Sequence, residues 1–168
     1  MKRATFLLVI ALVIGACGGG NSDETAREPE GCPPPTAPRS GPTFGTGRAL
    51  IDTGEESVLI DLEVAERDEQ RFRGLMFREC LPADSGMAFI YFDETSGGFY
   101  MKNTLIPLSI AFFDEEGTIL EILDMEPCEE DPCEIYDPGV AYFGALEVNQ
   151  GAFERWGVEE GDRITITR

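Results

Sequence analysis

Residues 97–125 read GGFYMKNTLIPLSIAFFDEEGTILEILDM, and their pattern decides the fold class. Two apolar runs, Leu108–Phe113 and Thr118–Met125, flank the polar segment Asp114–Gly117. Short apolar runs bounded by turn residues are typical of buried strands. Asp and Gly are favoured in the turns between such strands. The stretch therefore predicts two strands joined by a turn.

The rest of the chain repeats this pattern on both sides. In Val58–Val64 apolar side chains occupy every second position, which is the period of a strand with one buried face. Other short apolar runs are likewise bounded by Gly, Pro or Asp. Further strands are therefore expected at Ala49–Asp52, Val58–Val64, Met87–Phe92, Gly98–Lys102 and Ala141–Val148, with a closing strand after Gly161-Asp162.

Two short helices are expected, at Ala65–Gly74 and Gly151–Trp156. The first begins with acids and ends with arginines before a glycine, an order that suits the helix dipole. Phe72, Leu75 and Met76 fall at helical spacing, so we expect them to form its buried stripe. With about seven or eight short strands, these elements predict a mainly β fold, either a compact small barrel or a sandwich.

The first residues, MKRATFLLVIALVIGAC, have the features of a bacterial lipoprotein signal peptide. Two cations precede an apolar run that is too short to span a bilayer, which needs about 20 residues. The small-small-Cys ending resembles a lipobox, although Ile14 stands where that motif usually has Leu. The alternative is an ordinary signal peptide with a chance cysteine. We expect residues 1–16 to be removed and Cys17 to be lipidated, which anchors the chain to a membrane of the bacterial cell envelope, outside the cytoplasm.

The segment after the predicted lipidation site differs in composition from the rest of the chain. Residues 17–43 consist mainly of Gly, Pro, Ser and Thr with scattered charges, and they have almost nothing to bury. Such a composition predicts a disordered tether. Residues 44–168 have the length and apolar content of a single globular domain.

The charge and the missing histidine exclude several functions. The chain has 13 Lys and Arg against 32 Asp and Glu, a formal net charge of −19. A protein that binds a nucleic-acid backbone needs a basic face, so no nucleic-acid partner is expected. Electrostatic attraction to anionic lipid is also excluded. Because the sequence contains no histidine, triads with histidine, His-ligated zinc and histidine pH switches are excluded as well.

With Cys17 assigned to lipid, four cysteines remain, and an even number in an exported chain indicates disulfides. Cys128 and Cys133 flank EEDP and are close enough to staple a turn. Cys32 would then pair with Cys80, although four cysteines allow three pairings. A Cys₄ metal site is disfavoured because Cys32 and Cys80 have no close mates, and neither a metal nor another cofactor is expected.

Five phrases carry a resemblance to a known family: RFRGLMFREC, SGMAFIYF, FYMKNTLIPLSIAFFDEEG, CEEDPC and ALEVNQGAFERWGVEEGDRI. Their order and spacing resemble the bacterial and archaeal family catalogued as domain of unknown function 192. The resemblance covers about residues 48–168. It implies a small, mostly β domain, often exported, whose biochemical activity is not established.

The chain departs from the family pattern at three positions. Tyr100 stands where Trp is usual, and Cys80 replaces a small or polar residue, which is consistent with a disulfide to Cys32. Ser109 stands where the family typically has Asp. A lysine at 102 with an aspartate at 109 could form an acid–base pair, and in this chain that pair is missing.

Five residues are candidates for a ligand site: Arg78, Tyr100, Lys102, Asn103 and Glu147. Lys102 is the only lysine besides Lys2, and a strand would place its ammonium beside the Tyr100 ring. It could bind a ligand, act as a reactive amine, or neutralise a buried carboxylate such as Glu147. Asn103 could contact a ligand or shape the following turn. Arg78 could pair with a nearby acid or complete a basic pocket.

These residues support three hypotheses about function. The first is an extracytoplasmic, lipid-anchored binding module for a small polar or carbohydrate-like ligand. The second is a hydrolase or lyase that uses the Lys102 amine or a carboxylate pair among Glu147, Asp93 and Asp114. The third is a structural envelope protein that docks on a partner through its acidic surface, and the sequence does not identify such a partner.

Overall fold

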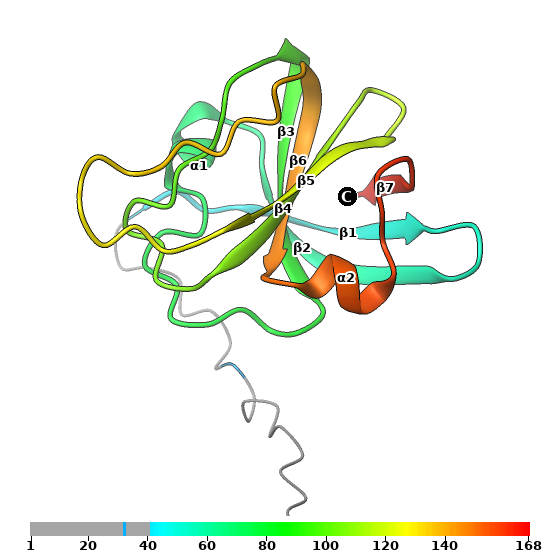
Figure 1. Cartoon of the computed structure of the whole chain (residues 1–168), viewed down its shortest axis with the longest axis horizontal. Coiled ribbons are helices and arrows are strands. Elements are labelled where there is room, and N and C mark those ends of the chain that lie inside the picture. Colours follow the sequence, from blue (N-terminus) through cyan, green and yellow to red (C-terminus); the bar gives the residue numbers. More distant parts are fainter. Residues whose placement is uncertain (1–31, 33–40) are drawn as a thin grey trace, which may run out of the picture. The chain divides into compact units, whose positions relative to one another are not determined.

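The computed structural model describes Cys32 and residues 41–168, and in this part a single seven-stranded sheet curls into a half-barrel (Figure 1). The strand order is β5-β4-β6-β3-β2-β1-β7. The predicted mainly β class, with two short helices, is confirmed. The elements are β1 Gly45–Asp52, β2 Ser57–Ala65, α1 Asp68–Arg73, β3 Ser85–Thr95, β4 Leu108–Phe113, β5 Ile119–Met125, β6 Tyr142–Asn149, α2 Ala152–Trp156 and β7 Arg163–Thr167.

The sheet is antiparallel except between β2 and β3, which run parallel. A parallel pair needs a crossover connection, and here α1 lies within it. At one end the β4–β5 turn reaches the opposite edge strand: Ile119 N donates to Asp162 O at 2.8 Å, and Ile164 N to Gly117 O at 2.7 Å. These bonds keep the sheet curled.

Central strands bury side chains on both faces. In β4, Ala111 and Phe113 belong to the inner apolar cluster, whereas Ile110 and Phe112 belong to the outer one. All six residues of β4 are buried. A strand with two buried faces appears in sequence as a continuous apolar run, which explains why LSIAFF does not alternate.

The outer face of the sheet is covered by connecting segments rather than by more strands. The segment predicted as a strand at Gly98–Lys102 makes only isolated bridges, between Phe99 and Tyr136 and between Lys102 and Cys128. That prediction is wrong because Phe99 packs on the sheet face: its ring lies 4.9 Å from that of Phe89 and 5.6 Å from that of Phe112. The expected alternation survives, since Met101 is buried and Tyr100 is exposed.

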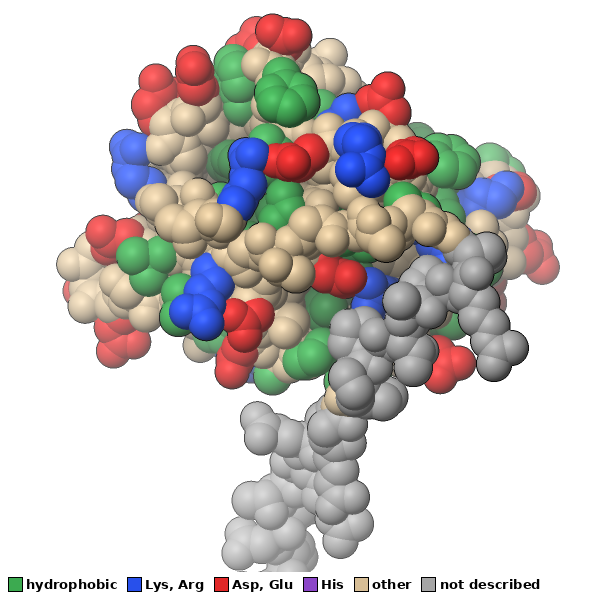
Figure 2. Space-filling view, turned by 180° about the vertical axis from the view of Figure 1, so that it is seen from behind, with side chains coloured by type: hydrophobic (Ala, Val, Ile, Leu, Met, Phe, Trp, Pro, Cys, Tyr) green, Lys and Arg blue, Asp and Glu red, His purple; other side chains and the backbone are tan. Residues whose placement is uncertain are grey.

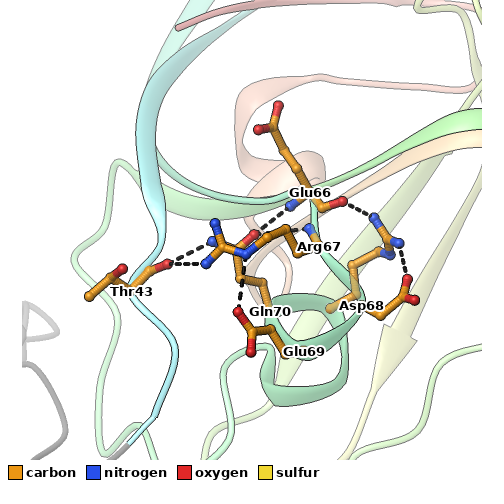
Figure 3. Close-up of polar contacts among 7 residues, drawn as sticks. Thr43, Glu66, Arg67, Asp68, Glu69 and Gln70 are labelled. Carbon is orange, nitrogen blue, oxygen red and sulfur yellow. Dashed lines mark hydrogen bonds and ion pairs between the residues drawn. The ribbon is translucent and has the colours of Figure 1, made fainter.

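The residues that helix α1 buries differ from the apolar stripe predicted for it. Phe72 is 72% exposed, and the buried residue of the helix is Gln70. The Gln70 amide donates to Thr43 O at 2.6 Å and accepts from the backbone of Glu66 and Arg67 at 3.0 and 2.9 Å (Figure 3). Because these bonds anchor α1 to the chain before β1, the helix does not need an apolar stripe along its whole length.

Both predicted disulfides are present, Cys32–Cys80 and Cys128–Cys133. Disulfides persist in oxidising compartments, so the chain belongs to such an environment. Among the described residues, no helix has the length and apolar character needed to cross a membrane. The predicted signal peptide, Cys17 and most of the predicted tether lie outside the described residues.

The glycine at 144 permits close packing of two central strands. A Cβ there would overlap the Phe113 ring and meet Phe89 O at 3.0 Å. We expect Gly144→Ala to destabilise the domain by about 1–3 kcal/mol, as overpacked cores do. Gly45→Ala is the matched control, because its Cβ would make only an ordinary contact at 3.6 Å with Val64. Urea unfolding of both variants measures the difference, and equal stability would contradict this account.

Candidate functional site

A pocket of about 130 Å³ opens on the outer side of the sheet, between α1 with its following turn and the 98–104 segment. We call it the Glu147 pocket. Strands β3 and β6 supply its floor, and the two covering segments supply its walls and rim. It is lined by Arg71, Phe72, Arg73, Gly74, Leu75, Met76, Phe89, Tyr91, Gly98, Phe99, Tyr100, Thr104 and Glu147.

Glu147 is the one acidic residue that lines this pocket, and the register of β6 places it there. Its neighbours in sequence, Leu146 and Val148, belong to the inner cluster, so the Glu147 side chain projects from the outer face. Its cross-strand partners are Met87 on β3 and Ile110 on β4, both fully buried. A carboxyl group is thus placed between two apolar side chains in the middle of the sheet.

The Glu147 carboxyl has no hydrogen-bond or ion-pair partner among the described residues, and the residue is only 6% exposed. Burial raises the pKa of this carboxyl to about 8, since an ionised carboxylate loses its hydration in such a site. Near neutral pH the group therefore holds its proton for much of the time. A protonated carboxyl can both donate and accept a hydrogen bond.

Arg71 forms a fixed, donor-rich wall. Its guanidinium donates to Ile90 O at 2.9 Å. It also donates to Glu66 O and to the Asp68 carboxylate, and these two acceptors are labelled in Figure 3. The same group lies over the Tyr91 ring, 4.8 Å from its centroid. These contacts hold the cation in one orientation, and stacking on an aromatic face stabilises it further.

The Tyr91 ring, over which Arg71 lies, contacts a second tyrosine, Tyr142. The rings of Tyr91 and Tyr142 meet edge to face at 5.7 Å, and the Tyr142 hydroxyl donates to Gly97 O at 3.0 Å. Burial raises the pKa of both phenols, and for Tyr91 the Arg71 charge acts in the opposite direction. Both hydroxyls therefore remain protonated near neutral pH. The Tyr142 hydroxyl is engaged with Gly97 O, whereas Tyr91 lines the pocket and its hydroxyl can donate a hydrogen bond there.

The structure brings two of the five predicted site residues into this pocket, Tyr100 and Glu147. Arg78 lies elsewhere and pairs with the Glu63 carboxylate on β2. Lys102 also lies outside the pocket: its ammonium donates to Asp131 in the Cys128–Cys133 loop at 2.6 Å. Lys102 therefore binds this loop, and the acidic partner of Lys102 is Asp131 rather than Glu147.

The Asp131 contact also determines the chemistry of Lys102. A hydrogen bond from the ammonium to Asp131 raises the lysine pKa, and the charge of Asp131 adds to this effect. Side chains of both residues are well exposed, at 48% and 63%. An exposed, protonated amine is a poor nucleophile, so this arrangement does not favour the reactive-amine role.

Asn103 shapes the turn beside the pocket. It adopts a left-handed backbone conformation, with φ of 60°, and its carbonyl accepts from Phe77 N at 2.8 Å. Asn tolerates this conformation better than most residues. Its side chain reaches toward Met76 Sδ, 4.0 Å away. The backbone of Asn103 thus ties the turn after α1 to the 98–104 segment.

Glu147 lies far along the sheet from the two aspartates proposed as its partners in the enzyme alternative. Glu147 pairs with Ile110, and Asp114 lies four residues further along, about 13 Å at the rise of a strand. Met87 is also opposite Glu147, and Asp93 lies six residues beyond it, about 20 Å away. In the described part of the chain, no three acidic or Cys side chains are close enough to hold a metal ion.

Ser109 has a structural role on the inner side of β4. Its hydroxyl donates to the Asp124 carboxylate and accepts from Gly151 N at 2.8 Å. Ser109 is buried, and its neighbour Leu108 points to the outer cluster. Ser109 and the Glu147 pocket are therefore on opposite faces of the sheet.

Sequence reasoning missed Arg71, Tyr91 and Thr104. Tyr91 could have been found, because Met87, Phe89 and Tyr91 follow a period of two and hence share one face. Arg71 had no such signal, since it resembles any arginine in the last turn of a helix. Thr104 is buried, at 7% exposure, by tertiary packing alone.

The sequence profile of DUF192, described as "Uncharacterized ACR", matches residues 49–166. The chain belongs to this family. A Sinorhizobium meliloti protein provisionally described as a transcription regulator has a similar structure, with a TM-score of 0.70 and 30% identity over 76% of this chain and 98% of its own. The structure of a Novosphingobium aromaticivorans protein of unknown function is also similar, with a TM-score of 0.69. Its sequence is 26% identical, and the match covers 81% of this chain and 94% of the other. No curated protein matches the chain.

Glu147 should make the stability of this DUF192 domain depend on pH. The native carboxyl holds its proton up to about pH 8, whereas the free group has a pKa of 4.5. Between these values the native state binds the extra proton, so this group stabilises the domain at low pH and its contribution is lost as pH rises to about 8.

We therefore expect the melting temperature of Glu147→Gln, relative to the unmodified protein, to rise between pH 5 and pH 8. Glu154→Gln, at an exposed position of helix α2, is the control for the loss of one negative charge. Differential scanning calorimetry across this range measures both differences. A difference that is constant with pH for Glu147→Gln would show that the carboxyl ionises normally in the folded protein.

Proposed function

We propose that the protein is a lipid-anchored extracytoplasmic binding module, and that the Glu147 pocket holds one small, uncharged, hydroxyl-rich group such as a sugar ring. The observation that carries this proposal is the buried, unpartnered Glu147 carboxyl at the floor of an open pocket. Burying a polar group without a partner costs free energy. A ligand that hydrogen-bonds to Glu147 removes this cost.

The chemistry of the walls favours such a ligand. Arg71 and Tyr91 present donors, and protonated Glu147 can donate or accept. Hydroxyl groups match this mixture because each one is both a donor and an acceptor. The Arg71 cation disfavours a positively charged ligand. The rings of Phe99 and Tyr100 provide apolar surface against which a ring can lie.

The volume of the pocket limits the ligand to one small group. The pocket volume of about 130 Å³ is below the usual range for drug-sized ligands, about 300–1,000 Å³. A single ring or the end of a longer molecule fits, and a nucleotide does not.

The proposed location agrees with the disulfides, which require an oxidising compartment. We assign membrane anchoring to Cys17, in the bacterial cell envelope, on the basis of the signal and lipobox-like sequence. The transcription-regulator description of the Sinorhizobium protein is not extended to this chain. Net charge is −19, and on the face in Figure 2 the Lys and Arg side chains are separate and several adjoin Asp or Glu.

Glu147→Leu and Glu147→Gln separate binding from folding. Glu147→Leu removes a buried carboxyl and should fold at least as stably as the unmodified protein, yet it should bind ligand at least tenfold more weakly. Glu147→Gln keeps a donor and an acceptor and should bind within a few-fold. Lys102→Met is the matched control outside the pocket and should bind normally.

The measurement is a ¹H–¹⁵N NMR titration with a panel of monosaccharides, polyols and small amides at millimolar concentration. We expect shifts at Tyr91, Thr104 and Glu147 with hydroxyl-rich compounds, and much smaller shifts at Tyr91 and Thr104 at the same concentrations in Glu147→Leu. Saturating shifts that persist in Glu147→Leu, or the absence of shifts with every compound in the panel, would refute the proposed ligand class.

A further inference from the structure

Four exposed apolar side chains lie on the segments that line the Glu147 pocket or directly next to them in sequence. Phe72 is 72% exposed, Phe77 53%, Leu105 54% and Tyr100 37%. Phe72 and Tyr100 line the pocket, whereas Phe77 and Leu105 directly follow the lining residues Met76 and Thr104. Three of the four are aromatic, and we call the group the aromatic rim. Groups of exposed apolar side chains mark interaction surfaces.

The backbone holds Phe77 outward at an energetic cost. Phe77 has a φ of 65°, which is unusual for a bulky residue, and its N–H is bonded to Asn103 O at 2.8 Å. Such a conformation carries an energetic cost and persists where the surroundings enforce it, often at functional sites. The Arg73 guanidinium lies over the exposed ring, 4.7 Å from its centroid. The ring is thus presented to solvent by a defined structure.

The N-terminal segment is attached to the domain beside this rim. Cys32 is bonded to Cys80, which lies three residues after Phe77 and so within about 11 Å of it along the chain. Thr43 O accepts hydrogen bonds from Gln70 and Arg67 on the α1 side (Figure 3). Both attachment points therefore belong to the same covering layer as the rim.

The length of the chain before Cys32 limits how far an anchor at Cys17 can be from the domain. Cys17 and Cys32 are 15 positions apart, so the chain between them spans about 54 Å at most. An anchor at Cys17 therefore keeps the Cys32–Cys80 attachment, and the rim beside it, within this distance of the lipid surface.

We propose that the aromatic rim docks on the lipid surface to which Cys17 is anchored, so that the Glu147 pocket opens at the level of the lipid headgroups. This rests on the lipid anchoring in the proposed function. Because the net charge of −19 opposes binding to anionic lipid, the attraction comes from apolar contact combined with the anchor. Phe and Leu side chains suit this interface, and neighbouring Arg73 can meet headgroup phosphates.

Because the chain contains only one tryptophan, Trp156, replacing it leaves a background in which each introduced tryptophan is the sole fluorescent reporter of its kind. In a Trp156→Phe background of the full, lipidated chain, Phe77→Trp and Phe72→Trp each report on the rim. Glu160→Trp is the control, because Glu160 is exposed in the turn after α2, and α2 packs on the inner cluster. Each protein is reconstituted into phosphatidylcholine vesicles that contain lipids brominated on their acyl chains, and circular dichroism verifies folding.

We expect the fluorescence of the two rim tryptophans to be quenched at least twofold more than that of the control. The same difference should shrink when Cys32 and Cys80 are both replaced by Ala, because the tether is then released from the rim. Equal quenching at all three positions in vesicle-bound protein would overturn the docking proposal. The separate proposal that the Glu147 pocket binds a ligand would not be affected by this result. If the unmodified chain floats with vesicles no better than Cys17→Ser, both the anchoring and the docking fail.

Discussion

The central strands of the sheet bury apolar side chains on both faces, and this constraint governs the rest of the domain. The inner face closes on itself because the sheet curls and the β4–β5 turn bonds to β7. In the part of the chain that the structure describes, no second sheet covers the outer face of β3, β4 and β6. Helix α1 and the segments around residues 98–107 and 126–138 provide that cover. The pocket exists because this cover is made of separate segments that leave a gap.

Glu147 lies in that gap. Its position in β6 would suit an apolar residue, since Met87 and Ile110 flank it across the strands. The polar groups that face it, Arg71 and Tyr91, are held by contacts with other residues and remain available at the pocket wall. A buried polar group without a partner is a departure from the rules that stabilise folds, and such departures concentrate at functional sites. The two cations that looked most interesting in the sequence, Arg78 and Lys102, have carboxylate partners of their own.

The same covering layer links the pocket to the N-terminal segment. Gln70 and Arg67 hold Thr43, and Cys80 holds Cys32. Helix α1 is held by the buried Gln70 and not by an apolar stripe, so Phe72 is not needed in the core and lies exposed at the pocket. Pocket, aromatic rim and attachment points are thus consequences of how one short helix is fastened to the sheet.

The sequence by itself determined the mainly β class, most strand positions and the family, because these depend on local periodicity, turn residues and motif spacing. It favoured the disulfide pairing that the structure shows, although four cysteines allow three pairings. It also singled out Glu147 and Tyr100. Only the tertiary structure decided that Gly98–Lys102 is a covering segment and that Lys102 meets Asp131. It also placed Arg71 and Tyr91 beside Glu147. These outcomes depend on which segments cross the outer face of the sheet, and contacts between residues distant in sequence leave no periodic trace along the chain.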